Sequence, residues 1–370
     1  MAKIKVLEII GDSSLAGAPR HFLSILESLD LEKFELSAIC PPGPLAGEIR
    51  SLRRHIDLEV FNMDSRFNME AIKKIRNQIK HIKPDLIHIH GTRAGSLGRL
   101  AAIGLNIPVI YTEHLWTKEF HLDNKFLNFI HFFGYWFLDL FTNLNIAVSG
   151  AVKEFLIDAG ISRDSKVKII YNGIEPPRHS ADIFQHDEIL IGTVGTLNQN
   201  KGMQFLIRAM PHIRKEFPTA KLEIIGDGPY KKHLMWEAKV QKLGDNVKFI
   251  GFVADVEKYL AKFDCYVQPS LSESFGLAIV QAMSLGLPVV ATETGGIPEI
   301  ITHGITGFLI PPQKPKIIAE SVIEILRNRE RARKMGQTAR KEVQIKFNLK
   351  DMISELEQVY EQTHKYPFFH

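Results

Sequence analysis

Cysteine is scarce in this sequence, and charge of neither sign dominates it. The two cysteines, Cys40 and Cys265, lie far apart, and each stands beside a hydrophobic run. This arrangement argues against a disulfide framework and is typical of a protein kept in a reducing compartment. The formal net charge is only +4 over 370 residues. The sequence therefore gives no electrostatic indication of nucleic-acid binding.

Long hydrophobic runs are also absent. The apolar run within residues 3–10 is too short for a secretory signal and is typical of a buried strand, so we expect a cytoplasmic protein. The longest apolar and aromatic segment, residues 126–141, contains Asn128, His131 and Asp139, whereas a spanning helix needs about 20 predominantly apolar residues. We expect this segment to form a helix buried against a sheet. Its many aromatic residues keep a second interpretation open, a peripheral contact with the inner face of a membrane.

Short apolar runs alternate with helical patterns along the chain. This alternation predicts parallel sheets built from βαβ units, and the length favours two domains over one hydrophobic core. A turn-rich stretch at residues 171–177 marks the linker. The predicted doubly wound domains are residues 1–174 and 175–346, and a last helical pattern follows within 347–370. The predicted strands are 4–10, 36–40, 86–90, 109–112 and 145–148 in the first domain, and 190–194, 221–225, 247–249, 265–268 and 288–291 in the second.

The stretch from Ser270 to Met283, SLSESFGLAIVQAM, is the most informative motif. A predicted helix begins within it shortly after a strand, and Glu273 stands just before that helix. The N-terminus of a helix carries backbone amides without intrahelical partners and the positive end of the helix dipole, which together favour phosphate binding. The residues expected to contribute are Ser274 as the N-cap, Phe275, Gly276 and Leu277 through their amides, and Gln281 on the helix itself.

Two more loops of the second domain follow predicted strands. Thr196 and Lys201 lie in GTLNQNKG, after the strand at 190–194. A lysine at the mouth of a helix can neutralise a diphosphate, although a lone lysine is usually a solvated surface group. Gly226 lies in GDGP, after the strand at 221–225, where a glycine permits a tight turn and the close approach of a nucleotide.

The loop after the first strand, GDSSLAGAPRH, holds Gly17 and opens a helix. Small residues there permit a diphosphate or a sugar to approach the backbone. A flexible strand-to-helix loop explains them at least as well, because the dinucleotide fingerprint Gly-x-Gly-x-x-Gly does not occur in the chain.

Histidines lie near the ends of two strands of the first domain. His114 follows the strand at 109–112, where it could donate to a sugar hydroxyl or be a structural histidine. We expect His88 and His90 to point to opposite faces of their strand, and so not to chelate a metal as a pair. His90 is nearer to the strand end and is a candidate to face a substrate. Arg93 either meets an anionic group of that substrate or faces solvent.

These motifs together resemble those of the retaining nucleotide-sugar glycosyltransferases of family 4, and the resemblance covers nearly the whole chain. Members of that family carry Glu, seven residues and Glu; here Glu273 is the first of the pair and Gln281 replaces the second. They also read Gly-Arg-Leu, three residues and Lys-Gly, and here Thr196 replaces the arginine. The resemblance implies a GT-B fold, with two Rossmann-like doubly wound domains facing across a cleft and the C-terminal helix, within 347–370, packing back on the first domain.

The resemblance also implies a role for each candidate. Glu273 and His114 would contact the transferred sugar, and Lys201 would neutralise the leaving diphosphate, which makes these three the candidate catalytic residues. Gln281 would hold the ribose without charge-assisted hydrogen bonds, which weakens binding by on the order of 1 kcal/mol. The other donor-binding candidates are Gly17, Thr196, Gly226, Ser274, Phe275, Gly276 and Leu277, and the acceptor-binding candidates are His90 and Arg93.

The implied reaction moves a hexosyl or N-acetylhexosaminyl group from a nucleotide diphosphate sugar, with UDP favoured, to a hydroxyl of a glycan or lipid-linked glycan. The chain has no two aspartates separated by one residue, the pair with which metal-dependent glycosyltransferases hold their cation, so we expect neither a metal nor another cofactor. Two alternatives remain open. Because Gln281 and Thr196 remove charge, the chain could be a non-catalytic nucleotide-sugar-binding partner subunit, or it could be an epimerase that shares the GT-B fold.

Overall fold

The computed structural model describes residues 2–66, 68–115, 117, 125–185 and 188–366, and only the backbone of residues 125–129. It divides into two compact units. The first consists of Met1–Gly173 with Leu349–His370, and the second is Ile174–Asn348. The sequence analysis ends the first domain at residue 174 and the second at residue 346, which are one and two residues from the boundaries in the structure.

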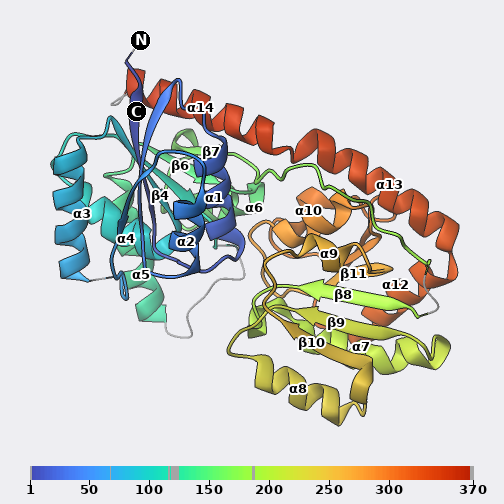
Figure 1. Ribbon diagram of the computed structural model, residues 1–370. Coiled ribbons are helices and arrows are strands. Elements are labelled where there is room, and N and C mark those ends of the chain that lie inside the picture. The colour runs from blue at the N-terminus through green and yellow to red at the C-terminus, as the bar shows by residue number, and fades with distance from the viewer. Residues whose placement is uncertain (1, 67, 116, 118–124, 186–187, 367–370) are drawn as a thin grey trace. The chain divides into compact units, whose positions relative to one another are not determined.

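A seven-stranded parallel sheet forms the centre of the first unit (Figure 1), with the strand order β3-β2-β1-β4-β5-β6-β7. Its strands are β1 (Ile4–Ile10), β2 (Phe34–Cys40), β3 (Asp57–Val60), β4 (Leu86–His90), β5 (Val109–Glu113), β6 (Leu144–Ala147) and β7 (Val167–Ile169). Its α-helices are α1 (Gly17–Ser28), α2 (Pro44–Ser51), α3 (Met69–Ile82), α4 (Gly91–Ala102), α5 (Lys125–Asp139), α6 (Gly150–Asp158) and α14 (Leu349–Lys365).

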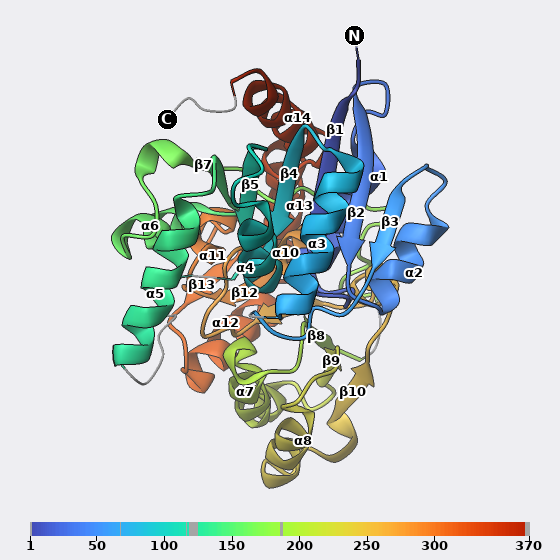
Figure 2. The ribbon, with the colours of Figure 1, turned by 90° about the vertical axis from the view of Figure 1, so that its left-hand side faces the viewer.

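Successive residues of the strands contribute to two cores, one on each face of this sheet. Val6 and Ile10 belong to a core with residues of α1, α2 and α14, whereas Leu7 and Ile9 belong to a core with residues of α3 and α4. Side chains alternate between the faces of a strand, so a strand covered on both faces reads as a continuous apolar run. Figure 2 views the sheet from the side on which α3 lies in front of the strands.

Helix α14 packs on the first unit, although it follows the second unit in the chain. Met352, Leu356 and Tyr360 are buried in the same core as the inner face of α1. Their spacing of four residues places them on one face of the helix. Tyr360 also reaches the buried polar network described below, so the end of the chain contributes a functional group to the interior of the first unit.

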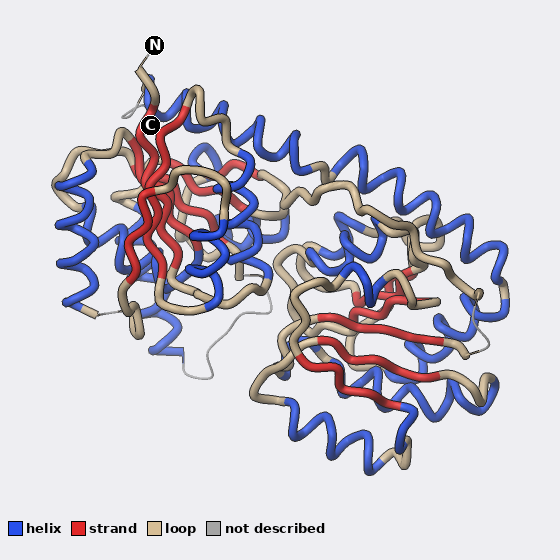
Figure 3. The backbone as a smooth tube through the Cα atoms, viewed as in Figure 1, coloured by secondary structure: helices blue, strands red, loops and turns tan. Residues whose placement is uncertain are grey.

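The second unit has a six-stranded parallel sheet with the order β10-β9-β8-β11-β12-β13, and helices lie on both sides of it (Figure 3). The strands are β8 (Leu190–Val194), β9 (Lys221–Ile225), β10 (Val247–Gly251), β11 (Cys265–Gln268), β12 (Val289–Thr292) and β13 (Phe308–Ile310). The α-helices are α7 (Met203–Glu216), α8 (Lys231–Val240), α9 (Glu257–Leu260), α10 (Leu277–Ser284), α11 (Ile297–Ile300), α12 (Pro315–Arg327) and α13 (Arg329–Lys346).

The structure contains elements that the sequence analysis does not identify. Strands β3, β7 and β13 and helix α11 span only three or four residues each, too few for a periodic pattern to show. Helix α13 is long, but its buried stripe includes the small residues Ala332, Gly336 and Ala339, which leave a weak apolar pattern. Gly336 lies so close to Gly286 that a Cβ would stand 1.9 Å from the Gly286 carbonyl oxygen. Close packing therefore explains the small residues of α13.

The expected burial of residues 126–141 is correct for one side of the helix only. Tyr135 and Leu138 are buried, and the Tyr135 hydroxyl donates to the Thr92 carbonyl oxygen of α4. On the other side Phe133 is 54% exposed, Trp136 43% and Leu140 54%. The sequence pattern could not separate these sides because apolar residues occur all around the helix. Among the described residues, no helix is both long and apolar enough to cross a membrane.

Candidate functional site

Both sheets have the strand order of a doubly wound fold, and the candidate residues lie where that order reverses. In such sheets, ligands bind at the carboxyl ends of the strands on either side of the reversal. In the second unit this point lies between β8 and β11, which precede Lys201 and Glu273 respectively. In the first unit it lies between β1 and β4, and His90 is the last residue of β4.

An ion pair joins the two charged candidates of the second unit. Lys201 Nζ donates to Glu273 Oε2 at 2.6 Å, and both side chains are largely buried. The backbone brings them together, because the Leu271 amide donates to the Asn200 carbonyl oxygen at 2.7 Å. A partly buried carboxylate can accept from hydroxyls, and a lysine beside it can shift to an incoming anion. The two residues that the sequence analysis assigns to one site are therefore in direct contact.

A chain of hydrogen bonds from the interior orients the Glu273 carboxylate. The Tyr266 hydroxyl donates to Gln268 Oε1 at 2.5 Å, and Gln268 Nε2 donates to Ser270 Oγ at 2.8 Å. Ser270 Oγ then donates to Glu273 Oε2 at 3.1 Å. Tyr266, Gln268 and Ser270 are all buried, and burial raises the pKa of Tyr266 far above its ordinary value. The phenol therefore stays protonated and acts as a fixed donor.

Glycines hold the loops of this region against one another. Gly202 has a positive φ of 64°, and a Cβ there would stand 1.9 Å from the Pro269 carbonyl oxygen. The loop of Lys201 therefore lies directly on the start of the Glu273 loop. Gly226 has φ 128°, and a Cβ there would stand 2.0 Å from the Gly195 carbonyl oxygen. Only glycine satisfies both the conformation and the close approach.

Helix α10 begins at Leu277, and Ser274 is not its N-cap. The N-cap is Gly276, with φ 110°, which has no side chain to accept a hydrogen bond. This corrects the sequence prediction: the positive φ moves the helix start two residues beyond the serine. The first amides of a helix have no intrahelical acceptors, so α10 begins with donors suited to an anion. Phe275 is buried, and its ring lies edge-on to that of Phe347 at 5.4 Å.

Two residues of the second unit, Thr196 and Gln281, depart from the pattern of the similar enzymes. Thr196 is exposed in the loop after β8. Gln281 is half-buried and lies in the second turn of α10. In the described part of the chain, no hydrogen bond is made by the Gln281 side chain, although its carbonyl oxygen accepts from Ser284. Neither residue brings a charge to the site.

A buried polar network occupies the corresponding end of the first unit. The Tyr360 hydroxyl donates to Glu8 Oε1 at 2.6 Å, and His90 Nε2 donates to Glu8 Oε2 at 2.8 Å. The single hydroxyl proton of Tyr360 is used in the bond to Glu8, so its oxygen accepts from His88 Nδ1 at 2.5 Å. Burial by itself raises the pKa of Glu8, but the attraction and hydrogen bonds of His88 and His90 outweigh it and hold that pKa below its ordinary value. Glu8 is therefore a buried anion whose two oxygens both accept hydrogen bonds.

The expectation that His88 and His90 point to opposite faces is wrong. Residues two apart on a strand share a face, and the centroids of the two rings lie 3.9 Å apart. Both side chains are buried. His88 is bonded on its two nitrogens by Tyr360 and Thr112, so it is a structural member of the network, whereas the Nδ1 side of His90 faces His114.

His114 and His90 meet a third histidine, His21 of α1. His114 Nε2 lies 3.5 Å from His90 Nδ1, and the His21 ring lies 5.1 Å from that of His114 and 5.8 Å from that of His90, between centroids. Burial, followed by the effect of His88, lowers the pKa of His90 to about 4. Burial and the neighbouring imidazoles hold the pKa values of His21 and His114 well below the usual range. All three rings are therefore neutral at pH 7.

The remaining first-unit candidates lie at the surface. The Arg93 guanidinium donates to the Gly11 carbonyl oxygen at 3.0 Å while the residue as a whole is exposed. Gly17 is the exposed first residue of α1, and a Cβ there would meet nothing within 4 Å. The open space next to Gly17 leaves room for a ligand. Packing within the protein does not explain why this residue is a glycine.

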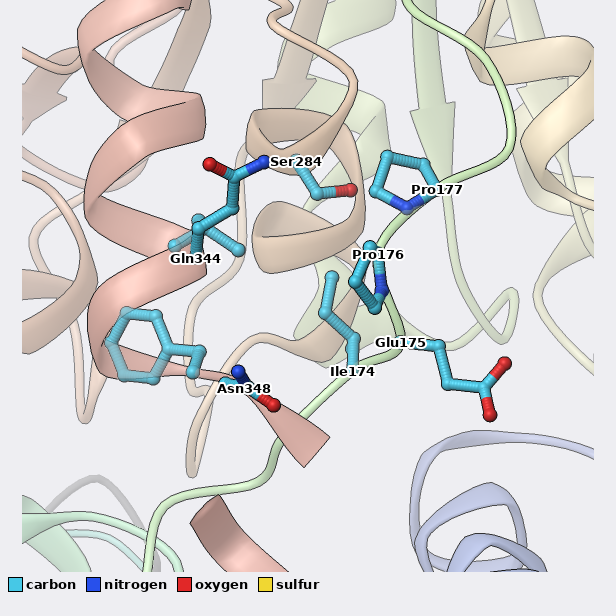
Figure 4. A pocket seen from close by; sticks show the side chains of 9 residues that line it. Ile174, Glu175, Pro176, Pro177, Ser284, Gln344 and Asn348 are labelled. Atoms are coloured by element: carbon cyan, nitrogen blue, oxygen red, sulfur yellow. The ribbon is translucent and has the colours of Figure 1, made fainter. Parts of the chain in front are cut away.

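The second unit also contains a cavity of about 260 Å³ that holds none of the predicted site residues. In Figure 4, the Gln344 side chain lies next to Ser284 on one side of it, and the Glu175 carboxylate points away. No charged group among its labelled residues points inward, which does not suit a nucleotide diphosphate. Its lining residues are Ile174, Glu175, Pro176, Pro177, Ser284, Val343, Gln344, Phe347 and Asn348.

Sequence reasoning missed Glu8, His21 and Tyr360 as members of the first-unit network. One signal was available: Glu8 is the only acidic residue in the apolar run of β1, and a carboxylate within a buried strand requires partners. Tyr360 lies some 350 residues further along the chain, and no local pattern links it to Glu8. His21 lies in the first turns of a predicted helix, and that position does not show whether its side chain turns to the end of the sheet or to solvent.

Two family models match the chain and together cover residues 15–342. Residues 15–178 match the model described as Glycosyltransferase Family 4, and residues 178–342 match that described as Glycosyl transferases group 1. A relative from Bacillus anthracis, N-acetyl-alpha-D-glucosaminyl L-malate synthase, is 28% identical over 80% of this chain and 79% of its own length. A relative from Escherichia coli, UDP-Gal:alpha-D-GlcNAc-diphosphoundecaprenol alpha-1,3-galactosyltransferase, is 26% identical over 84% of both chains. Two further relatives share 35% and 29% identity, but the matches span only 59% and 55% of those proteins.

The fold is also that of a solved structure, Anabaena Alr3699/HepE in complex with UDP-glucose. The TM-score is 0.85 at 22% sequence identity, and the alignment covers 97% of this chain and 100% of the other. The similarity in fold extends through both units.

Proposed function

This chain belongs to the group 1 glycosyl transferases of family 4, and from that premise we propose that it moves a hexosyl or N-acetylhexosaminyl group to a hydroxyl with retention of anomeric configuration. It is a glycosyltransferase of the GT-B type that uses a nucleotide sugar. The donor in the proposal is a UDP-sugar, and the acceptor is a glycan or a lipid-linked glycan. The ion pair between Lys201 and Glu273 beside the start of α10 carries the proposal.

The second unit holds the donor in this proposal. The diphosphate lies at the first amides of α10, where the helix dipole favours negative charge, and Lys201 Nζ turns from Glu273 to a phosphate oxygen. Glu273, held by Ser270, then accepts from hydroxyls of the transferred sugar. Gln281 bonds the ribose through its amide. The loops of Thr196 and Gly226, which glycine contacts hold together, surround the nucleotide.

The transfer itself takes place on one face of the sugar. The bond between the anomeric carbon and the phosphate oxygen breaks, the leaving UDP oxygen takes the proton of the acceptor hydroxyl, and the acceptor oxygen bonds to the anomeric carbon from the same side. Lys201 and the amides of α10 stabilise the charge that grows on the diphosphate. His114, a neutral imidazole, donates to a sugar hydroxyl, and His90 and Arg93 contribute to acceptor binding.

Catalysis needs no metal ion in this proposal. Lys201 and the start of α10 supply the positive potential that a divalent cation provides in enzymes with an Asp-x-Asp pair. Turnover is therefore expected to continue unchanged in excess EDTA.

A lipid-linked acceptor suits the exposed aromatic side of α5. Phe133 and Trp136, whose ring centroids lie 5.4 Å apart, form an exposed apolar surface with Leu140. Aromatic rings of this kind favour the interface between water and lipid, and the Escherichia coli relative is named for a diphosphoundecaprenol-linked acceptor. The double variant Phe133→Ser with Trp136→Ser should lose sedimentation with phospholipid vesicles, whereas Trp236→Ser, an exposed tryptophan of the second unit, should not. Equal sedimentation of all three proteins would refute the membrane contact.

The reaction is tested by acceptor-dependent release of UDP. Purified protein is incubated with UDP-glucose, UDP-N-acetylglucosamine or UDP-galactose, with and without a membrane extract, and with EDTA throughout. The proposal predicts UDP release with at least one donor only when the extract is present, and a product anomeric signal of the same configuration as the donor. UDP release without transfer would favour a hydrolase, and conversion of the donor into an epimeric UDP-sugar without net UDP release would favour an epimerase. Nucleotide binding without turnover would identify the non-catalytic subunit that Gln281 and Thr196 also suit.

A further inference from the structure

The three neutral histidines of the first unit have an arrangement that the proposed transfer does not require. We propose that His21, His90 and His114 form a binding site for Zn²⁺, with one coordination position left open. The site is distinct from any metal held against the donor diphosphate. Its existence depends on the geometry of the first unit alone, whereas its effect on turnover rests on the proposed function.

The spacing of the nitrogens fits one tetrahedral ion. One ligand nitrogen from each of the three histidines lies within 4.8 Å of the others, and the His90 Nδ1 to His114 Nε2 distance is 3.5 Å. Two nitrogens bound to one tetrahedral Zn²⁺ at about 2.0–2.1 Å are about 3.3–3.4 Å apart. The two rings are also within 26° of parallel. The His21 nitrogen lies within 4.8 Å of the other two, so it must approach them by up to about 1.5 Å to complete three ligands.

Glu8 provides the outer support that histidine zinc sites normally have. A ligating histidine usually donates its second N–H to a carboxylate, which fixes its tautomer and makes the ligating nitrogen more basic. His90 Nε2 donates to Glu8 Oε2 at 2.8 Å, so the lone pair of Nδ1 faces His114. The negative charge of Glu8 also offsets the charge of a buried cation.

Entry is possible from one side. His21 and His114 remain 7% and 6% exposed, while Glu8 is fully buried. In the proposal, a metal enters past His21 and His114, and the fourth coordination position is filled by water or by a substrate oxygen. The imidazoles need not lose a proton to bind, because burial keeps them neutral.

Zinc at this site would inhibit the proposed transfer. His114 would be a metal ligand and could no longer donate to the transferred sugar, and His90 would leave the acceptor. Micromolar Zn²⁺ is therefore expected to reduce turnover, and EDTA to restore it. The binding measurement below does not use turnover, so failure of the proposed reaction would leave the metal site testable.

The experiment measures Zn²⁺ binding to the full chain, prepared without a histidine tag and stripped of metal. Competition with a chromophoric chelator should give one tight site per chain. His21→Ala should weaken it by about two orders of magnitude, as the loss of one of three ligands implies. His179→Ala is the matched control, because His179 is exposed and lies in the second unit. Circular dichroism of each variant establishes that it is folded.

Co²⁺ serves as a second probe that needs no variant. In the wild-type protein, the proposal predicts the intense visible absorption of a tetrahedral Co²⁺ ion, removed by one equivalent of Zn²⁺. Only weak absorption, typical of octahedral surface coordination, would overturn the proposal. So would equal Zn²⁺ affinity in the wild type and in folded His21→Ala or His21→Gln.

Discussion

The two units place polar residues at equivalent ends of similar sheets, but they hold them in opposite ways. In the second unit, Lys201 and Glu273 are partly exposed at the edge of the sheet, here called the rim. Backbone contacts of Gly202 and Gly226 fix the loops of this rim. In the first unit, Glu8 and its partners are sealed in the interior and bonded on nearly every polar atom. A rim site can change partners when a ligand arrives, whereas a sealed network resists change. The comparison predicts that substitutions of Lys201 and Glu273 mainly affect turnover, whereas substitutions of Glu8 and Tyr360 mainly affect stability.

The largest effect is expected from the rim ion pair. Glu273→Ala and Lys201→Ala should each lower turnover by about 10²–10³-fold, the usual loss when a group that stabilises the transition state is removed, and should change the unfolding midpoint little. Initial rates of UDP release measure this. Glu324→Ala removes a surface partner of Arg331 in the same unit and is the control. Near-normal rates in both site variants would overturn the assignment.

The sealed network should show the reverse behaviour. Tyr360→Phe removes the donor to Glu8 and the acceptor of His88, so it should lower the free energy of unfolding by about 1–3 kcal/mol, as expected for buried groups left unpaired. Denaturant titration of the wild type and variant measures the difference. Tyr366→Phe changes an exposed tyrosine and should be neutral. If the two variants have the same midpoint, the network does not contribute to stability.

A third test restores charge to the rim. Gln281→Glu should tighten UDP-sugar binding by about tenfold, because a carboxylate makes stronger hydrogen bonds to the ribose diol than an amide does. Titration calorimetry gives the dissociation constants. Gln344→Glu, a second-unit glutamine lining the separate cavity, should leave them unchanged. An unaltered affinity in Gln281→Glu would place the ribose elsewhere.

The smallest effect concerns the residue that positions Glu273. Ser270→Ala removes one hydrogen bond to the carboxylate and should reduce kcat about fivefold, corresponding to about 1 kcal/mol, with little change in KM. Ser270→Thr keeps the hydroxyl and should recover most of the rate. A loss of equal size in both variants would indicate that packing, and not the hydroxyl, is responsible.

The same contrast explains how much the sequence could predict. The second-unit candidates lie in short contiguous motifs that follow predicted strands. The sequence could therefore predict the doubly wound fold and the closeness of Lys201 to Glu273. Gly202 and Gly276 are glycines for a local reason, their positive φ. The error at Ser274 is local too, since a positive φ at Gly276 is not visible in a residue pattern. The first-unit network joins Glu8 to Tyr360 across almost the whole chain, and no local pattern carries that pairing. The exposed side of α5 was missed because an all-round apolar sequence does not show which side is covered.

The most direct test of the donor site is a crystal structure of the protein with a bound UDP-sugar. The account predicts the diphosphate at the first amides of α10, Lys201 Nζ moved from Glu273 to a phosphate oxygen, and Glu273 bonded to hydroxyls of the sugar. A nucleotide bound elsewhere, for example in the cavity beside Pro176 and Phe347, with the ion pair of Lys201 and Glu273 intact, would contradict it.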